Sequence, residues 1–268
     1  PSDKLNRNLR DRPILFHKAH IPYIGITGIV SPAESEVITQ ISLGNSARQI
    51  MMGVLVSSKS LRGERNKWPD RYPNIRDIAG VFTHNPATFN VIHYNTDQPA
   101  TLSEQLEEVR RLAGPNLHGF QLNMSWPSVP ELRRFTYQNP DQKMILQINQ
   151  EAFWAVEGLT GGLIYKLKQE YLGFIDHILL DLSAGYGRPL ETAWARQLLQ
   201  KLQDAELGIG LGVAGGLGPA SLQLVEPLAK DFPELSIDAE TNLRDGNDNL
   251  DLDLAQDYLR QAFVMFGD

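Results

Sequence analysis

The sequence predicts an α/β fold, a single (β/α)8 TIM barrel, from three observations. Eight strand-like segments alternate with eight helix-like segments, and together they fill the roughly 250 residues that such a barrel needs. No internal repeat and no shift in composition marks a domain boundary within residues 1–268. Polar residues recur where the strands end, which is where these barrels carry their sites. The doubly wound open sheet is the main alternative, because alternation alone does not separate the two folds.

The expected strands are short apolar runs bounded by glycine, proline or polar residues. The seventh run alternates glycine with Ile209, Leu211 and Val213, which suits a buried strand that neighbouring backbones approach closely. In chain order, we expect strands at residues 22–28, 49–57, 90–95, 119–123, 143–149, 176–181, 208–214 and 235–238.

The expected helices follow these strands. The first has Ser31 as its N-cap, Pro32 at the first helical position and Glu34 at the capping-box position, and it ends near Gly44. Glycines at 158, 161 and 162 weaken the middle of the long fifth helix. The later helices are expected at residues 74–82, 101–113, 129–137, 152–171, 191–205, 220–230 and 252–266.

Two segments lie outside this alternation. Residues 1–20 form an expected N-terminal arm, and residues 58–73 form a long basic loop without predicted structure. Because the loop follows a strand, a barrel places it on the catalytic face. It is either a solvated surface or a lid that brings Arg62, Arg65 or Arg71 onto an anionic substrate.

Composition excludes several classes of protein. The chain is 42% hydrophobic and has no cysteine, so it can build a core and has no disulfide framework, thiolate zinc site or cysteine nucleophile. Its net charge of −7 and the lack of a basic run argue against nucleic-acid binding. No stretch reaches membrane-spanning length and no signal peptide is evident. We expect a cytoplasmic monomer or homodimer that needs no cofactor.

Polar side chains recur at period two where successive strands end. The third strand ends with His93 and Asn95 on one face. The fourth strand ends in the same way with Gln121 and Asn123, and the fifth with Gln147 and Asn149. Because alternate residues share a face, these side chains are expected to gather at the mouth of the barrel. They form either a substrate site or a hydrogen-bonded polar plug.

Asp181 and the Gly215-Gly216 turn are the strongest single candidates. Asp181 ends the apolar sixth strand, where a carboxylate suits a general acid, although it could instead cap nearby loop N–H groups. Gly215 and Gly216 follow the seventh strand and precede Pro219 at a helix start. Such a strand, Gly-Gly turn and helix can bind phosphate or carboxylate, or can be a tight turn with no ligand.

Several of these motifs together resemble phosphoribosylanthranilate isomerase, the barrel enzyme of tryptophan synthesis. They span residues 22–245 and are Ile26-Thr27-Gly28-Ile29, Ser31-Pro32, Gln121-Leu122, Ile178-Leu179-Leu180-Asp181, Gly185-Tyr186-Gly187 and Ala214-Gly215-Gly216-Leu217-Gly218-Pro219. The resemblance implies an Amadori rearrangement, in which a general acid protonates the ring oxygen of a phosphoribosylamine and a base removes its C2 proton. It implies that Asp181 is the general acid and that Gly215 and Gly216 bind phosphate.

Two departures from the family pattern change what the resemblance implies. The family's base is a cysteine in a K-x-C-G motif, whereas this chain has Gly25-Ile26-Thr27-Gly28, and a threonine cannot replace a thiolate without a partner base. After the eighth strand the family has small residues for phosphate, whereas this chain has Glu240, with Arg244 as a possible compensating charge. The departures predict a relative that kept the scaffold and changed its chemistry.

Other chemistries fit less well. A Schiff-base aldolase needs a strand-end lysine, and only Lys59 offers one. The histidines and carboxylates at strand ends are too few for a metal site, so none is expected. Asp181 could instead pair with Glu240 or with His93, each as the partner base.

The sequence therefore predicts an acid/base isomerase or lyase for a small, phosphorylated sugar derivative. Its catalytic residues are Asp181, His93 and Glu240. The expected substrate-binding residues are Thr27, Asn95, Gln121, Asn123, Gln147, Asn149, Gly215, Gly216 and Arg244. The alternative is a catalytically silent barrel that binds a metabolite or a partner protein, favoured by the missing base at Thr27 and by Glu240.

Overall fold

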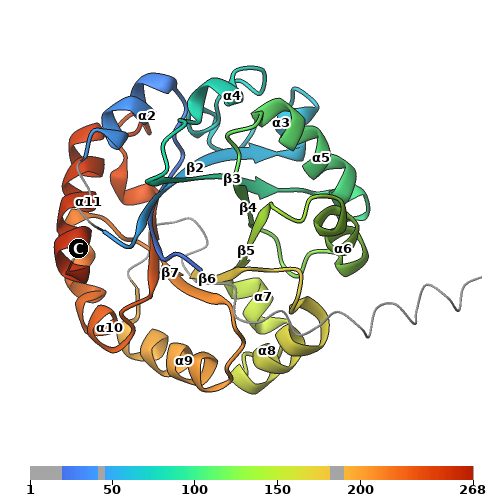
Figure 1. The fold of residues 1–268 in the computed structure, drawn as a ribbon, viewed down its shortest axis with the longest axis vertical. Helices are drawn as coiled ribbons and strands as arrows, with labels where there is room; N and C mark the ends of the chain where they lie inside the picture. Colours follow the sequence, from blue (N-terminus) through green and yellow to red (C-terminus); the bar gives the residue numbers. More distant parts are fainter. Residues whose placement is uncertain (1–19, 42–45, 182–189, 268) are drawn as a thin grey trace, which may run out of the picture.

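The computed structural model describes residues 20–41, 46–181 and 190–267, and in them the chain forms a closed eight-stranded parallel barrel. The strands are β1 (Tyr23–Thr27), β2 (Gln49–Ser57), β3 (Thr88–Asn95), β4 (Gly119–Leu122), β5 (Lys143–Ile148), β6 (His177–Asp181), β7 (Gly210–Ala214) and β8 (Ser236–Ala239). Because β8 pairs with β1, the sheet has no free edge and the open-sheet alternative is excluded. Figure 1 shows the helices as a ring around the strands.

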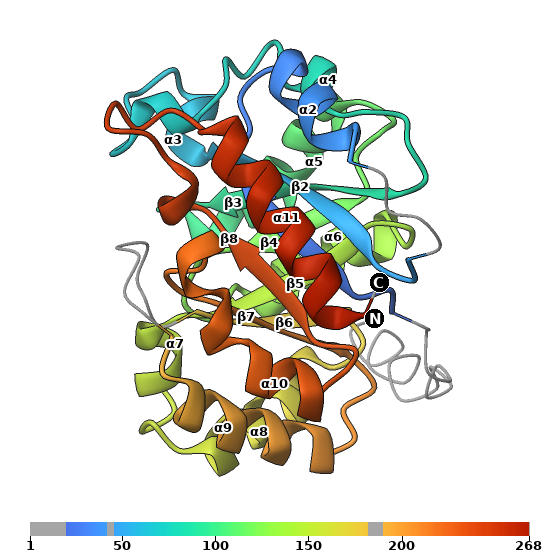
Figure 2. The same ribbon diagram turned by 90° about the vertical axis from the view of Figure 1, so that its left-hand side faces the viewer.

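The helices of this ring begin and end as follows: α2 (Pro32–Thr39), α4 (Ile78–Val81), α5 (Leu102–Ala113), α6 (Val129–Gln138), α7 (Gln150–Trp154), α8 (Thr160–Lys166), α9 (Thr192–Asp204), α10 (Glu226–Asp231) and α11 (Leu252–Phe266). Figure 2 shows α11 running across the outside of the barrel beside β8, and it also contacts β1 and α2. The predicted capping box is confirmed, because the Ser31 hydroxyl accepts from the N–H of Glu34 and the Glu34 carboxylate accepts from the N–H of Ser31.

The expected helix at residues 152–171 is wrong as a single element. It divides into α7, α8 and a π-helical turn, η3 (Leu167–Tyr171). The break has a backbone cause, because Glu157 and Gly158 adopt φ values of 60° and 66°. The expected helix at 220–230 is also divided, into the 3-10 helix η4 (Pro219–Leu224) and α10, with Pro227 at the start of α10.

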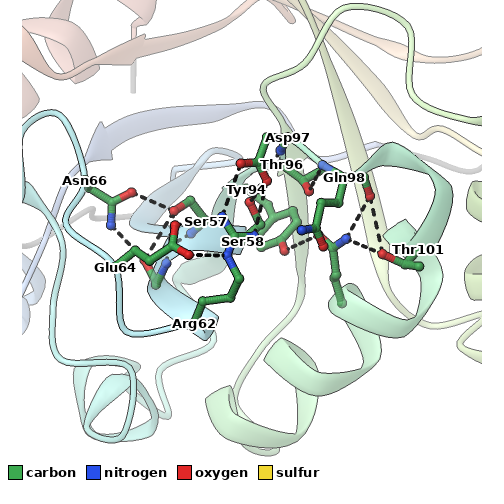
Figure 3. Close-up of polar contacts among 12 residues, drawn as sticks. Ser57, Ser58, Arg62, Glu64, Asn66, Tyr94, Thr96, Asp97, Gln98 and Thr101 are labelled. Carbon is green, nitrogen blue, oxygen red and sulfur yellow. Dashed lines mark hydrogen bonds and ion pairs between the residues drawn. The ribbon is translucent and has the colours of Figure 1, made fainter.

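The loop at residues 58–73 was expected to be structureless, and this is wrong. It contains α3 (Ser58–Leu61) and the short 3-10 helix η1 (Pro69–Arg71). Figure 3 shows it tied to the loop after β3: Ser58 donates to Asp97 at 2.8 Å, and Arg62 pairs with both Asp97 and Glu64. Arg62 is therefore engaged with two carboxylates of its own chain.

The barrel interior is divided into an apolar floor and a polar layer above it. The floor is a cluster of Tyr23, Met51, Phe89, Val91, Ile145, Leu179 and Ala214. One pleat nearer the carboxyl ends of the strands, the inward residues become polar, and they are Thr27, His93, Gln121, Gln147, Asp181 and Asp238. All six are at most 9% exposed, so the polar groups must find partners within the layer or in a ligand.

Candidate functional site

The polar layer surrounds a small cavity of about 30 Å³ at the carboxyl ends of the strands, here called the central pocket. Sheet register places Asp181, Ala214 and Asp238 side by side on β6, β7 and β8, and His93 beside Gln121 on β3 and β4. The lining of the central pocket includes seven of the predicted site residues: His93, Gln121, Gln147, Asp181, Gly215, Gly216 and Glu240. It also includes Asp238, which was not predicted. The structure thus gathers most of the predicted catalytic side chains.

Thr27 and Asp238 form the best-defined pair in this layer. The Thr27 hydroxyl lies 2.9 Å and 3.0 Å from the two carboxylate oxygens of Asp238, to one of which it donates. Asp238 fits beside β1 because residue 25 is glycine: a Cβ there would lie 2.6 Å from Asp238 Oδ1. Burial raises the pKa of Asp238 from 3.8 to about 7, against the lowering effect of the Thr27 hydrogen bond.

A chain of amides connects Gln121 to Asp181. Gln147 Nε2 donates to Asp181 Oδ2 at 2.8 Å, and Gln121 Nε2 donates to Gln147 Oε1 at 3.2 Å. Both amides therefore point their N–H groups along the layer toward Asp181. Gln121 Oε1 is then left buried, with no hydrogen-bond partner among the described residues.

His93 lies in the same layer and is 8% exposed. Neither ring nitrogen makes a hydrogen bond of normal geometry to a described residue, although the Gln147 amide is nearby. Burial lowers the pKa of His93, so the ring is neutral near pH 7. A neutral imidazole can both donate a hydrogen bond to a ligand and accept one.

Glu240 follows β8 at the edge of the central pocket, and an arginine of the long loop holds it. Arg71 Nη1 lies 2.8 Å from Glu240 Oε1, and Arg71 Nη2 lies 2.7 Å from Asp248 Oδ1. Arg244, the compensating charge expected from sequence, instead donates to the carbonyls of Thr27 and Gly28 at 3.0 Å and 2.8 Å. The partner of Glu240 therefore comes from the loop after β2.

The Gly215-Gly216 turn has the backbone conformation that its sequence predicts, with φ values of 125° and 61°. Side chains of Asn242 and Ser221 already occupy one side of this turn. Asn242 Nδ2 donates to the carbonyl of Gly216 at 2.6 Å, and Ser221 Oγ donates to the same atom at 2.8 Å. The loop after β8 thus packs directly against the loop after β7.

The three strand-end asparagines lie outside the central pocket. Asn95, Asn123 and Asn149 line a neighbouring groove of about 300 Å³, here called the outer groove, with Met124, Trp126 and Glu151 among its other walls. Asn149 also caps α7, because its Oδ1 accepts from the N–H of Ala152 at 2.8 Å. The expected single ring of polar residues is therefore two adjacent sites. Trp126 forms one wall of the outer groove.

Solved structures share this architecture, whereas no protein-family model and no curated protein matches the sequence. The phosphoribosylanthranilate isomerase of Thermotoga maritima aligns with a TM-score of 0.63 and 18% identity over 91% of this chain and 98% of that one. The enzyme of Thermus thermophilus gives 0.62 and 18% over 90% and 99%. The chain has the fold of these isomerases. At such identities the likeness shows the fold, in agreement with the distant resemblance that the motifs predicted.

A third such isomerase was solved in complex with reduced 1-(o-carboxyphenylamino)-1-deoxyribulose 5-phosphate, and it aligns with a TM-score of 0.59 at 16% identity over 91% of this chain and 98% of that one.

Among the described residues of the present chain, no group of three histidine or acidic side chains is placed to hold a metal ion. No helix in the described part is long and apolar enough to cross a membrane. The motif residues 185–187 lie outside the described residues.

The sequence analysis did not identify Asp238 as a site residue, and it did not single out Arg71 from the other arginines of the long loop. The signal for Asp238 was present, because Ser236 and Asp238 alternate with Ile237 and place a carboxylate on the inward face. Gly25 was a second signal, since a glycine at an inward position leaves room for a side chain across the barrel. Arg71 was one of three arginines in a basic loop, and nothing in the sequence distinguished it from Arg62 or Arg65.

Proposed function

We propose that this chain is an acid/base isomerase for a small sugar derivative, with Asp181 as general acid and Asp238 as general base. The observation that carries the proposal is the hydrogen bond between Thr27 and the buried carboxyl group of Asp238. Thr27 stands where the resembling family has its cysteine base, and a threonine needs a partner base to act there. Asp238 supplies one, and its pKa of about 7 suits proton transfer near neutral pH.

The proposed reaction is a proton relay across the central pocket. Asp181, as the general acid, donates a proton to the ring oxygen of a glycosylamine, and the C1–O bond breaks to give an iminium ion. The Asp238 carboxylate then removes the C2 proton, and the electron pair of that C–H bond neutralises the iminium nitrogen. The enaminol tautomerises to an aminoketose, so atoms and charge balance within the isomerisation.

The other residues of the layer position these two carboxyl groups. The hydrogen bond from Gln147 orients Asp181, and the hydrogen bond from Thr27 orients Asp238. Neutral His93 lines the pocket, and neither of its nitrogens makes a hydrogen bond of normal geometry to a described residue, which suits a hydrogen bond to a substrate hydroxyl. In this scheme Thr27 orients the base and is not itself the base.

Phosphate at Gly215 and Gly216 stays a prediction of the sequence. The positive φ values of both glycines support it, and the nearby carboxylate of Glu240 opposes it. Cytoplasmic location and a monomeric or homodimeric state also stay predictions.

The test is turnover of two glycosylamines by the purified protein. Phosphoribosylanthranilate and its dephosphorylated counterpart are each incubated with the wild-type protein, and loss of anthranilate fluorescence is followed. Asp181→Asn and Asp238→Asn are the matched variants, since both keep the size of the side chain. We expect turnover of at least one compound and loss of about a hundredfold or more in each variant.

The outcomes separate the candidate functions. Turnover that survives Asp238→Asn contradicts the assignment of the base, and turnover that survives Asp181→Asn contradicts the assignment of the acid. If neither compound is consumed, the silent barrel is favoured over the isomerase.

A further inference from the structure

We infer that the central pocket recognises a small cationic amine, such as the ammonium group of an amino sugar, in preference to a phosphate group. This inference deepens the proposed function, because it names the substrate class of the same site. It rests on the balance of hydrogen-bond donors and acceptors in the described lining of the pocket, and on the charges of that lining.

The described lining is rich in acceptors. Asp181, Asp238 and Glu240 contribute carboxylate oxygens, and no lysine or arginine is among the described residues of the lining. Gln121 Oε1 is a further buried acceptor with no partner among the described residues. An ammonium group carries three N–H donors and a positive charge, which matches such a lining, whereas a phosphate carries only acceptors at neutral pH.

Two deeply buried polar side chains point to a ligand independently of the acidic residues. Gln121 is 1% exposed and His93 is 8% exposed, and both line the central pocket. Within the described residues the Gln121 carbonyl oxygen has no hydrogen-bond partner, and neither His93 ring nitrogen makes a hydrogen bond of normal geometry. Buried polar atoms without a partner are costly, so a donor from a ligand would remove a penalty already present in the fold.

Size and nearby charges also favour an amine. A cavity of about 30 Å³ has room for about two water-sized groups, so it accepts an ammonium head more readily than a phosphate. Two arginines lie nearby, but neither is in the described lining: Arg71 pairs with Glu240 and Asp248, and Arg244 donates to the carbonyls of Thr27 and Gly28. The adjoining outer groove adds no cation, because Glu151 is the one charged residue of its described lining.

The experiment is a comparison of dissociation constants by titration calorimetry at pH 7.5 for three probes on one scaffold: glucosamine, glucose and glucose 6-phosphate. We expect glucosamine to bind about tenfold or more tightly than glucose, and glucose 6-phosphate to bind most weakly. Equal binding of glucosamine and glucose, tighter binding of glucose 6-phosphate, or no detectable binding of glucosamine overturns the inference.

Two variants localise the effect. Glu240→Gln should reduce the preference for glucosamine over glucose about tenfold, while Glu104→Gln, which removes one negative charge from an exposed position in the first turn of α5 outside both pockets, should leave it unchanged. Equal effects of the two variants would mean that general surface charge, not the pocket, attracts the amine. Binding needs no turnover, so an amine preference without catalysis leaves this inference standing while the proposed isomerase fails.

Discussion

At the scale of single residues, Asp238 combines a buried position with a pKa near neutrality. Its neighbours explain both properties, because Gly25 leaves it room and Thr27 keeps one hydrogen bond to its carboxylate. Desolvation is the largest cause of its raised pKa, and the nearby Glu240 and Asp181 add to it. Such a carboxyl group is costly to ionise and useful for proton transfer.

Asp181→Asn is expected to abolish isomerisation without unfolding the protein. The substitution keeps the shape of the side chain and an oxygen that can accept from Gln147, but it removes the acidic proton. Turnover should fall by about a hundredfold or more, while the melting temperature measured by circular dichroism stays close to that of the wild type. A large fall in melting temperature would instead assign Asp181 a structural role.

Asp238→Asn is expected to stabilise the protein above neutral pH. The folded-state pKa of about 7 is above the ordinary 3.8, so the carboxyl group contributes stability below about pH 4 and loses it as the pH rises through 7. An asparagine has no such dependence. Relative to the wild type, the variant should gain up to about 4 kcal/mol of unfolding free energy between pH 4 and pH 8, measured by urea denaturation. A constant difference across this range would show that Asp238 does not titrate abnormally.

At the scale of elements, the strands follow the sequence closely and the helices less so. Strand β6 and the residues that end β3, β4 and β5 lie where apolar runs and period-two polarity predicted them. The helices at 152–171 and 220–230 are divided because local backbone geometry overrides a favourable average composition. Pro227 was visible in the sequence, whereas the positive φ of Glu157 was not.

The long loop after β2 gains its structure from partners distant in sequence. Arg71 donates to Glu240 and Asp248, which lie more than 160 positions away. No local pattern indicates such contacts, so a basic loop was all that could be predicted. The contacts anchor η1 to the loop after β8 at the edge of the central pocket.

Arg71→Ala is expected to destabilise the fold and to release this anchor. Removing the arginine leaves two carboxylates beside each other without their shared partner, which costs several kcal/mol when fully buried. Since Glu240 and Asp248 are 20% and 32% exposed, we expect about 2 kcal/mol, measured by urea denaturation. Arg62→Ala is the control, because its partners Glu64 and Asp97 are exposed and its loss should lower the free energy of unfolding much less.

At the scale of the whole molecule, the barrel has different chemistry at its two ends. The carboxyl ends of the strands carry the polar layer, while the opposite end carries an aromatic cluster in which His177 lies near Tyr23, Phe89 and His20. Burial lowers the pKa of His177 from 6.5 to about 4. The alternation of strand-like and helix-like segments predicted the barrel. The pairing of side chains across the barrel interior could not be predicted, because it depends on how the closed sheet brings distant strands together.

Acid is expected to weaken the fold through His177. Because its folded-state pKa is below its ordinary value, the unfolded chain binds the proton first, and stability falls as the pH drops from about 6.5 to about 4. His177 should account for about 3 kcal/mol of the loss, measured as the difference between the wild type and His177→Gln in urea denaturation at several pH values. The part that remains in the variant comes from other buried histidines such as His93.

The most direct test of the account is a carbon-13 NMR titration of the Asp238 carboxyl group in the wild type and in Thr27→Val and Thr27→Ser. We expect the Asp238 carboxyl group to have a pKa of about 7 in the wild type. The pKa should be higher in Thr27→Val, which lacks the hydroxyl donor, and unchanged in Thr27→Ser. A wild-type pKa near 4, or no response to loss of the hydroxyl group, would contradict Asp238 as the base that Thr27 orients.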